Sequence, residues 1–357
     1  MRVAIIGGGV MGCASALELA RRGADVVVLE RAVPGAEASS AAAGILGAQV
    51  ESHGPGPLVA TFVRAREEYA AWTEALREAS GIDVGFRRSG VLRVGRSADE
   101  AASLARDVAW NLEAGLRAEL LDGPGARKVE PELAADVEAA AWFPDDAQVD
   151  PPALLRALVA ACGRAGVTFR AGATVQRLLV EGDRCRGVEL EDGPLEAGAT
   201  VLAAGSWSSL VPGVPRAVPH VRPARGQMVL LDERPPRARV IVFGKGAYVV
   251  PRGDGRVLCC STLEFVGFRR EVTAGGVHAI LGGAIAVMPS LAAAQLAGTW
   301  NNFRPHVEGP PMMGSSPLPG LFLATGHHRN GILLAKVTGD AVADSVMGSR
   351  ASPTPPH

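Results

Sequence analysis

The first thirty residues contain the pattern that most restricts the fold of this chain. An apolar run, Val3–Ile6, is followed by the glycine pattern Gly7-x-Gly9-x-x-Gly12, by apolar residues at helical spacing, and by a second apolar run that ends at Glu30. A strand, a glycine-rich turn, a helix and a second strand in this order form a βαβ unit that binds dinucleotides. The sequence therefore predicts a Rossmann-like parallel sheet with a nucleotide at its first turn.

Each residue of this unit has a separate physical role. Gly7 permits the tight turn, Gly9 lets a pyrophosphate approach the backbone, and Gly12 lets the helix lie close to the sheet. The free amides and the positive end of the helix then face the phosphates. Glu30 ends the second strand, where its carboxylate can accept hydrogen bonds from both ribose hydroxyls. FAD and NAD share this arrangement, so it does not distinguish between them.

The residues after this unit favour FAD. A free-standing NAD domain normally continues with further strand–helix units, but this chain continues into small residues from Ser39 to Leu46. Small side chains allow a second close approach to a large flat ligand, and Ser39 and Ser40 can donate hydrogen bonds to phosphate. The alternative is a helix capped by serine and followed by alanines.

The remaining patterns divide the 357 residues into two discontinuous α/β domains. Residues 199–205 and 321–326 read as further buried strands of the first domain, and a final helix is expected from about Gly331 to Met347. Residues 248–260 read as a hairpin of a second domain. The predicted ranges are 1–80, 140–210 and 315–348 for the FAD-binding domain, 81–139 and 211–314 for an α+β substrate domain built on an antiparallel sheet, and 349–357 for a frayed tail.

Composition and charge exclude several classes of protein. Lys and Arg (36) nearly balance Asp and Glu (37), and the net charge of −1 gives no electrostatic reason to expect nucleic acid as a partner. The five cysteines include no Cys-x-x-Cys pair, so neither a disulfide framework nor a metal site is expected. The N-terminus lacks the features of a signal peptide, and we expect a cytoplasmic protein.

One long stretch carries no charge. Residues 272–303 contain no Asp, Glu, Lys or Arg, which is enough length to span a bilayer, but they include glycines, a proline, Gln295 and Asn301. We predict a buried or interface helix around Val277–Val287 and a strand near Trp300, with no membrane span. A helix without a charged face is expected to be covered by another subunit, so a homo-oligomer is predicted.

The motifs taken together resemble the D-amino-acid oxidase and glycine oxidase family of FAD enzymes, and are most similar to the bacterial glycine oxidases of thiamine biosynthesis. The resemblance covers nearly the whole chain. Its most specific part is the strand-to-helix turn from Gly326 to Ala335, which in the family passes beside the flavin ring. The other matching segments are 3–12, 40–48, 201–207, 248–252 and Arg304-Pro305.

The resemblance implies FAD held without a covalent bond, because the cysteines lie far in sequence from the final motif. It implies an amino acid bound over the flavin, with its carboxylate on Arg304, Tyr248 beside it and Arg329 at the flavin edge. A guanidinium matches a planar carboxylate with two parallel hydrogen bonds. The implied reaction is hydride transfer from the substrate Cα to flavin, reduction of molecular oxygen to hydrogen peroxide, and hydrolysis of the imine to an oxoacid and ammonia. Backbone amides from Gly331 to Leu333 are expected to stabilise charge on the ring.

The candidate residues follow from these motifs. The candidate catalytic residues are Tyr248, Arg304 and Arg329. The candidate substrate-binding residues are Ile45, Phe243, Tyr248, Leu263, Arg304 and Arg329. The candidate cofactor-binding residues are Gly7, Gly9, Val10, Met11, Gly12, Glu30, Arg31, Ser39, Ser40, Ala42, Ala43, Gly44, Val175, Ala204, Gly205, Trp207, Gly326, His327, Arg329, Asn330, Gly331, Ile332 and Leu333.

Several positions depart from the glycine oxidase pattern. Phe243 and Gly246 offer no hydroxyl or imidazole, Leu263 stands where methionine is common, and Asn301-Asn302 replaces small residues. These differences leave amine oxidation in place and make a larger amine, such as a D-amino acid, an N-methyl amino acid or a biosynthetic intermediate, an alternative substrate to glycine. A dehydrogenase that passes electrons to a non-oxygen acceptor, a non-catalytic flavin-binding protein and an NAD dehydrogenase are the other readings.

Overall fold

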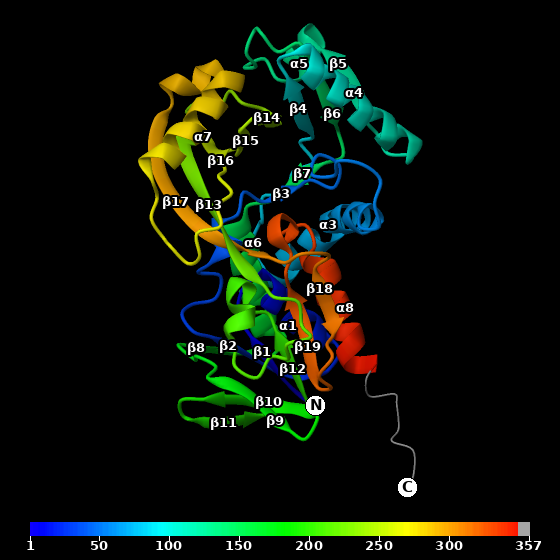
Figure 1. The fold of residues 1–357 in the computed structure, drawn as a ribbon, viewed down its shortest axis with the longest axis vertical. Helices are drawn as coiled ribbons and strands as arrows, with labels where there is room; N and C mark the ends of the chain where they lie inside the picture. Colours follow the sequence, from blue (N-terminus) through cyan, green and yellow to red (C-terminus); the bar gives the residue numbers. More distant parts are fainter. Residues whose placement is uncertain (349–357) are drawn as a thin grey trace.

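A six-stranded sheet contains the predicted βαβ unit and forms the lower half of the molecule in Figure 1. The computed structural model describes residues 1–348. The strand order is β18-β19-β12-β1-β2-β8, and every neighbouring pair is parallel except β18 and β19. The strands are β1 (Arg2–Ile6), β2 (Asp25–Glu30), β8 (Thr168–Ala171), β12 (Ala199–Leu202), β18 (Met312–Ser315) and β19 (Leu321–Thr325).

Alternation along β1 gives this sheet two buried faces. Val3 and Ile5 belong to a core shared with helices, in which α1 and α8 lie against the strands and α6 and α3 pack on those helices. Ala4 and Ile6 belong to a second core, shared with a small three-stranded antiparallel sheet. These elements are α1 (Val10–Arg21), α3 (Val59–Ser80), α6 (Pro151–Arg164), α8 (Ala335–Gly348), β9 (Arg177–Glu181), β10 (Arg184–Leu190) and β11 (Gly193–Glu196).

An eight-stranded sheet forms the upper half of the molecule (Figure 1). Its order is β17-β13-β16-β15-β14-β4-β6-β5, and it is antiparallel as predicted, apart from the parallel pair of β14 and β4. The strands are β4 (Val91–Gly95), β5 (Glu119–Asp122), β6 (Ala139–Phe143), β13 (Arg222–Asp232), β14 (Ile241–Gly244), β15 (Ala247–Pro251), β16 (Arg256–Cys260) and β17 (Gln295–His306).

Helices cover both faces of this second sheet. Cys259 lies in the core on the α7 side, and Cys260 lies in the core on the α4 side, so the two neighbouring cysteines point to opposite faces of the sheet. The remaining elements are α2 (Ala38–Ala41), α4 (Ala98–Glu113), α5 (Gly123–Val129), α7 (Ala274–Val287), the short strands β3 (Ile45–Leu46) and β7 (Ala147–Gln148), and the 3-10 turns η1 (Gly205–Leu210), η2 (Pro289–Ala293) and η3 (His328–Asn330).

The charge-free stretch forms the predicted helix and strand, α7 and β17. Within residues 1–348, no helix has both the length and the apolar character needed to cross a membrane. The hairpin expected at 248–260 is present as β15 and β16, with its turn at residues 253–255.

The prediction for the final helix was wrong at its start. Residues 331–334 form turns, and α8 begins only at Ala335. The backbone reason is that the amide of Ala335 bonds the carbonyl of Ile332 at 3.2 Å, a spacing of three residues and not four. The amides of Gly331, Ile332 and Leu333 therefore belong to a turn ahead of the helix.

The division into two domains stays a proposal. Its predicted ranges agree closely with which strands belong to which of the two large sheets. β6 starts at Ala139 and pairs with β4 of the second sheet, so the expected boundary at residue 140 falls inside a strand. β18 starts at Met312, three residues ahead of the boundary expected at 315. The expected frayed tail, 349–357, lies outside the described residues.

Candidate active site

A cavity of about 330 Å³ lies between the two sheets. One wall consists of residues at the carboxyl ends of the parallel strands, including Ile6, Glu30 and Thr325, which is where open α/β sheets bind ligands. The opposite wall comes from β13, β15 and β17 of the second sheet and includes Tyr248 and Arg304. Residues expected to bind a cofactor and residues expected to bind a substrate therefore share one cavity.

The glycine turn at the end of β1 is shaped by close backbone contacts. Gly7 has φ +107°, and a β-carbon at this position would lie 2.5 Å from the carbonyl oxygen of Ala203. A β-carbon at Gly12 would lie 1.9 Å from the carbonyl oxygen of Gly7, so any side chain would separate α1 from the turn. Gly9, Val10 and Met11 line the cavity, and the first turn of α1 carries no acidic side chain. The positive end of the helix thus faces the cavity and is suited to an anion.

Glu30 and Ser39 hold backbone groups next to this turn. The Glu30 carboxylate accepts hydrogen bonds from the amides of Gly8 and Ala32, both at 2.9 Å, and Glu30 lines the cavity. Ser39 also lines the cavity, where its hydroxyl oxygen accepts a hydrogen bond from the amide of Val10 at 3.0 Å. The hydroxyl hydrogen of Ser39 stays available for a ligand.

An aromatic and ionic cluster closes the cavity beside Glu30. The Arg31 guanidinium lies 3.9 Å from the centre of the Trp207 ring, within the range of a cation–π contact. Glu37 accepts hydrogen bonds from Arg31 at 2.8 Å and from Arg270 at 2.8 and 2.9 Å. Arg270 comes from the segment that follows β16, so this cluster joins the two halves of the chain. Sequence reasoning identified Arg31 and Trp207 but missed Glu37 and Arg270.

At the other end of the cavity, Tyr248 and Arg304 share one partner. Arg304 donates from Nη2 to the Ser261 hydroxyl at 2.7 Å and from Nη1 to the carbonyl of Thr262 at 3.2 Å. The Tyr248 hydroxyl lies 3.2 Å from the same serine oxygen. Burial raises the pKa of Tyr248 to about 12, so the phenol stays protonated and can donate a hydrogen bond.

Arg329 reaches this end from the final motif. Its Nη1 lies 3.4 Å from Oε2 of Glu51, and both residues line the cavity, as does Ile45. Sequence reasoning missed Glu51, which lies five positions after the end of the small-residue tract at Leu46. Asn302, which the sequence analysis noted as a departure from the family pattern but did not name as a site residue, lines the cavity two residues before Arg304 on β17.

Two histidines of the final motif also line the cavity, and burial lowers the pKa of each to about 3. Nε2 of His327 lies 2.9 Å from the hydroxyl of Thr338, while its Nδ1 is buried with no partner within residues 1–348. His328 has φ +48°, an uncommon conformation for a residue with a side chain. Both imidazoles are therefore neutral near pH 7.

Most of the candidate residues line the cavity, and a few do not. Phe243 stacks on Tyr248 with ring centres 4.8 Å apart and supports it from outside the cavity. Leu263 is 44% exposed and lies away from the lining. The candidate cofactor-binding residues that lie outside the lining are Gly12, Ser40, Gly326 and Leu333. Of these, Gly12 and Gly326 stand where a side chain has no room: a β-carbon would lie 1.9 Å from the carbonyl oxygen of Gly7 at Gly12, and 2.8 Å from the side chain of Val307 at Gly326.

Comparison with known proteins decides the family. Residues 2–345 match the protein family described as FAD dependent oxidoreductase. The chain belongs to this family. The expected enzyme class, an FAD-dependent amino-acid oxidase, and the expected cofactor, FAD, are confirmed by this match together with the relatives described next.

Two relatives and one solved structure of this FAD oxidoreductase family illustrate the similarity. The chain is 36% identical to the glycine oxidase of Geobacillus kaustophilus over 96% of its own length and 92% of that protein. It is 35% identical to the bifunctional protein ThiO/ThiG of Nostoc sp. over 99% of its own length, but spans only 54% of that protein. The crystal structure of the Geobacillus glycine oxidase superposes with a TM-score of 0.93 at 35% identity, covering 99% of this chain and 96% of that one, which confirms the predicted fold.

The residues that line the cavity of this FAD oxidoreductase fit the parts of the cofactor. The glycine cradle leaves room for a phosphate at the positive end of α1, and the Glu30 carboxylate lies beside it for a ribose. The small residues Ala41 to Gly44 line the route from there to Tyr248 and Arg304, where a flat ring can enter. We assign the phosphates to Gly9, Val10 and Met11, and the ring end to Ala42–Gly44 and 327–332, as a proposal.

Near the described site, no metal centre competes with this assignment: among residues 1–348, no three His, Cys, Asp or Glu side chains come together in a way that could hold a metal ion.

Proposed function

We propose that this protein catalyses the oxidative deamination of a small amino acid such as glycine, sarcosine or a D-amino acid, with hydride transfer to FAD and reduction of oxygen to hydrogen peroxide. The observation that carries the proposal is the pair of Arg304 and Tyr248 in the same cavity as the glycine turn. The glycine oxidase relatives support a substrate with one carboxylate and one amine.

Bound FAD supplies the hydride acceptor for this reaction. The chain itself binds and orients the substrate. Arg304 keeps donors free for a carboxylate, because a guanidinium carries five N–H groups and residues 1–348 accept two hydrogen bonds from it. Its charge also stays available, because both acceptors, a hydroxyl and a carbonyl, are neutral. Tyr248 contributes a protonated phenol beside it. Fixing the carboxylate at one end of the cavity holds the amino acid in a single orientation, which is the main contribution required of the protein.

The neutral histidines fit the same proposal. Protonated imidazoles at positions 327 and 328 would repel a substrate ammonium group and would compete with Arg304 for the carboxylate. Burial keeps both neutral, since the pKa of each is lowered to about 3. The cations at this end of the cavity are therefore the guanidinium groups of Arg304 and Arg329.

We next consider which amine the proposed enzyme oxidises. Phe243 and Leu263 add no polar group to the cavity, so nothing in their position favours glycine over a larger apolar amine. The screen that decides is anaerobic reduction of the bound flavin by glycine, sarcosine and D- and L-amino acids. Bleaching by none of them would overturn the proposed activity and would favour a non-catalytic flavin-binding protein.

The acceptor is tested separately. We propose oxygen, so turnover under air should release one hydrogen peroxide for each amine oxidised. A dehydrogenase that passes electrons to a quinone or a protein would instead turn over only with an added dye.

Arg304→Ala tests the carboxylate assignment directly. Loss of a buried charged partner costs about 3–5 kcal/mol, so we expect the KM for the amino acid to rise by at least about a hundredfold while FAD stays bound. Arg222→Ala is the matched control, because Arg222 lies on the neighbouring strand with its side chain 48% exposed and paired with Glu308. Equal kinetics in the two variants would refute the role of Arg304.

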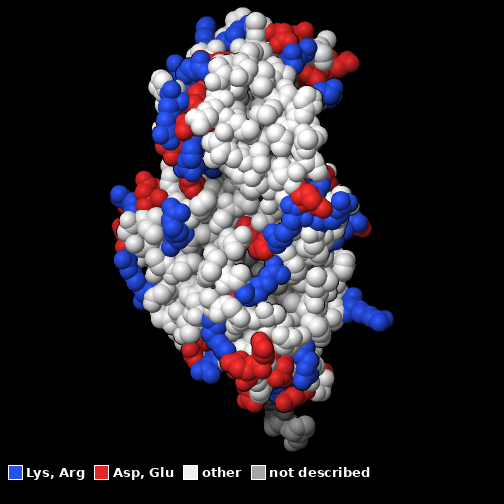
Figure 2. All heavy atoms as spheres, turned by 90° about the vertical axis from the view of Figure 1, so that its left-hand side faces the viewer, with Lys and Arg blue, Asp and Glu red and all other residues white. Residues whose placement is uncertain are grey.

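We also propose that the protein is a homo-oligomer located in the cytoplasm, with thiamine biosynthesis as its pathway. Figure 2 shows a broad uncharged area on the upper part of the face where α7 and β17 lie. Ala274, His278, Ala279 and Gly282 are exposed on α7, and Leu296 of the edge strand β17 is 54% exposed. A monomeric mass from light scattering at micromolar concentration would contradict the oligomer.

A further inference from the structure

Gly226 on β13 lies directly beneath the guanidinium of Arg304. A β-carbon at Gly226 would lie 2.2, 2.4 and 2.5 Å from Nη1, Nη2 and Cζ of Arg304. These three distances are nearly equal, so the plane of the guanidinium lies across the position that the β-carbon would occupy. The backbone of Gly226 is not left-handed, which means that space and not conformation requires glycine here.

The strand register explains why these two residues meet. Arg304 of β17 pairs with Ala224 of β13, and Gly226 pairs with Asn302. The Arg304 side chain therefore leans diagonally by two residues onto Gly226, a contact that long side chains make in antiparallel sheets. Gly226 and Arg304 both line the cavity, so the guanidinium lies on the floor that β13 provides.

The edge of the guanidinium is fixed by the segment after β16. Ser261 and Thr262 accept its two hydrogen bonds, at 2.7 and 3.2 Å. Both acceptors are uncharged, so they orient the guanidinium without neutralising it. The remaining donors are left for a carboxylate, which guanidinium groups bind through two parallel hydrogen bonds.

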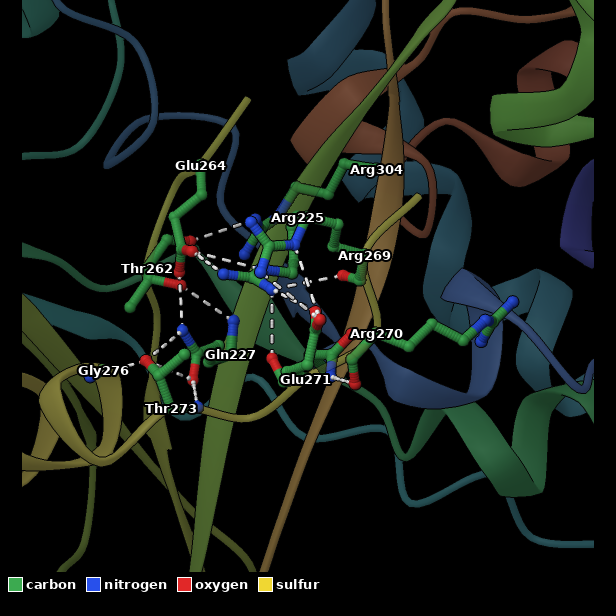
Figure 3. Close-up of polar contacts among 11 residues, drawn as sticks. Arg225, Gln227, Thr262, Glu264, Arg269, Arg270, Glu271, Thr273, Gly276 and Arg304 are labelled. Carbon is green, nitrogen blue, oxygen red and sulfur yellow. Dashed lines mark hydrogen bonds and ion pairs between the residues drawn. The ribbon is translucent and has the colours of Figure 1, made fainter. Parts of the chain in front are cut away.

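That segment is in turn attached to β13 on both sides of Gly226. The amides of Arg225 and Glu264 each bond the carbonyl of the other, at 2.9 and 3.0 Å, and the amide of Gln227 bonds the Thr262 hydroxyl at 2.9 Å. The Glu264 carboxylate bonds the guanidinium of Arg225, which is 5% exposed, and the Gln227 amide group at 2.7 Å (Figure 3). Residues 261–264 are thereby held in register with the strand that carries Gly226.

We propose that Gly226 is a positioning residue for the carboxylate site: its missing side chain lets the Arg304 guanidinium lie flat on β13, in reach of Ser261 and Thr262, and so sets where the substrate carboxylate binds. The proposal rests on the proposed function, since it takes Arg304 as the carboxylate partner. It predicts that a single methyl group on β13 weakens carboxylate binding without removing any polar group.

The test compares Gly226→Ala with the matched variant Gly298→Ala. Gly298 lies on β17, and a β-carbon there would meet nothing within 4 Å. In Gly226→Ala the far end of a flexible side chain moves and the backbone does not, so the fold and bound FAD are retained. Acetate is the probe, because it presents a carboxylate without an amine, and its binding is followed by the absorbance of the bound flavin with chloride as the ionic-strength control.

We expect acetate to bind at least about tenfold more weakly to Gly226→Ala, and within about threefold of wild type to Gly298→Ala. The KM for glycine should rise by a similar factor in Gly226→Ala, with kcat changed by less than about threefold, because binding and not hydride transfer is perturbed. Acetate affinity equal to that of wild type in Gly226→Ala would overturn the proposal.

A double-mutant cycle separates displacement of Arg304 from a direct clash with the ligand. With lysine at position 304, no planar group lies over residue 226, so Gly226→Ala should change acetate affinity by less than about threefold in the Arg304→Lys background. An equal loss in both backgrounds would show a direct clash and would refute the positioning role. If Arg304→Ala itself leaves acetate affinity unchanged, the proposed function fails at the carboxylate site, and that result is distinct from a failure of Gly226 alone.

Discussion

Arg66 and Asp146 form a buried ion pair behind the active site, and replacing Arg66 with methionine should destabilise the protein strongly. Both side chains are almost fully buried, at 2% and 0% exposure, and they lie 2.8 Å apart. Asp146 also accepts hydrogen bonds from the amides of Gln49 and Val50, at 3.2 and 2.9 Å. The pair therefore fixes the loop that carries Glu51 into the cavity.

Removing one partner leaves the other charge buried and unpaired, which costs about 3–5 kcal/mol. That is a large part of the roughly 5–15 kcal/mol by which folded proteins are stable. The sign of the pH dependence follows from Asp146. Burial raises the pKa of its carboxyl to about 6 despite Arg66, which lowers it. Without Arg66 this pKa rises further, so the folded variant takes up a proton more readily than the unfolded chain.

The free energy of unfolding that Arg66→Met loses relative to wild type should therefore be greatest above pH 8 and should shrink on acidification to about pH 5.5. Its change is up to about 1.4 kcal/mol per pH unit between the pKa of Asp146 in folded wild type and the higher pKa in the folded variant. Urea unfolding of the FAD-loaded protein, followed by circular dichroism, measures it. Arg64→Met on the same helix is the control, since Arg64 is 64% exposed with Glu68 at 3.7 Å and should cost less than about 1 kcal/mol. Equal deficits in both variants, or a deficit that grows as the pH falls, would refute this reasoning.

Two further predictions concern the final motif and the nucleotide end. His327 has its pKa lowered to about 3, below the unfolded value, so stability should fall as the pH drops below about 6.5, by about 2 kcal/mol at pH 5. Between pH 7.5 and pH 5, the free energy of unfolding of His327→Asn, measured with urea, should fall by about 2 kcal/mol less than that of wild type. An equal fall in variant and wild type would contradict this prediction. Glu30→Gln should bind FAD about tenfold more weakly, because only an anion accepts from both ribose hydroxyls and from Gly8 and Ala32 together. Fluorescence titration of the apoprotein with FAD measures this, and an unchanged Kd would count against Glu30 as the ribose residue.

Local patterns predicted the first βαβ unit correctly because its information is contained within about thirty residues. Val3–Ile6 is a short apolar run followed at once by glycines, which favours a buried strand, and Gly12 is explained by a contact with Gly7, five positions away. The start of the last helix could not be predicted in this way. Helical spacing continues through Gly331–Leu334, but the Tyr69 hydroxyl bonds the carbonyl of Ile332, a contact across 263 positions that no local pattern reveals.

The residues that sequence reasoning missed are those whose role depends on a distant partner. Glu37 belongs to no sequence motif, but it lines the cavity and accepts a hydrogen bond from Arg270, which lies 233 positions later. Glu51 follows a recognisable tract of small residues, and its carboxylate matters because of Arg329. Most candidate residues chosen from motifs line the cavity, while the ion pairs that complete its walls could be found only from the fold.

The two arginines at the substrate end differ in a way that motifs alone do not show. Arg329 is 41% exposed on its side chain and faces the Glu51 carboxylate, so its charge is largely offset by an acidic partner and by water. Among residues 1–348, the hydrogen-bond acceptors of the Arg304 side chain are the neutral oxygens of Ser261 and Thr262, and the guanidinium lies over the backbone of Gly226. A substrate carboxylate gains more from the cation whose charge is not already matched, because pairing with Arg329 would mean competing with Glu51. The asymmetry therefore favours Arg304 as the anchor and leaves Arg329 to shape the edge of the cavity.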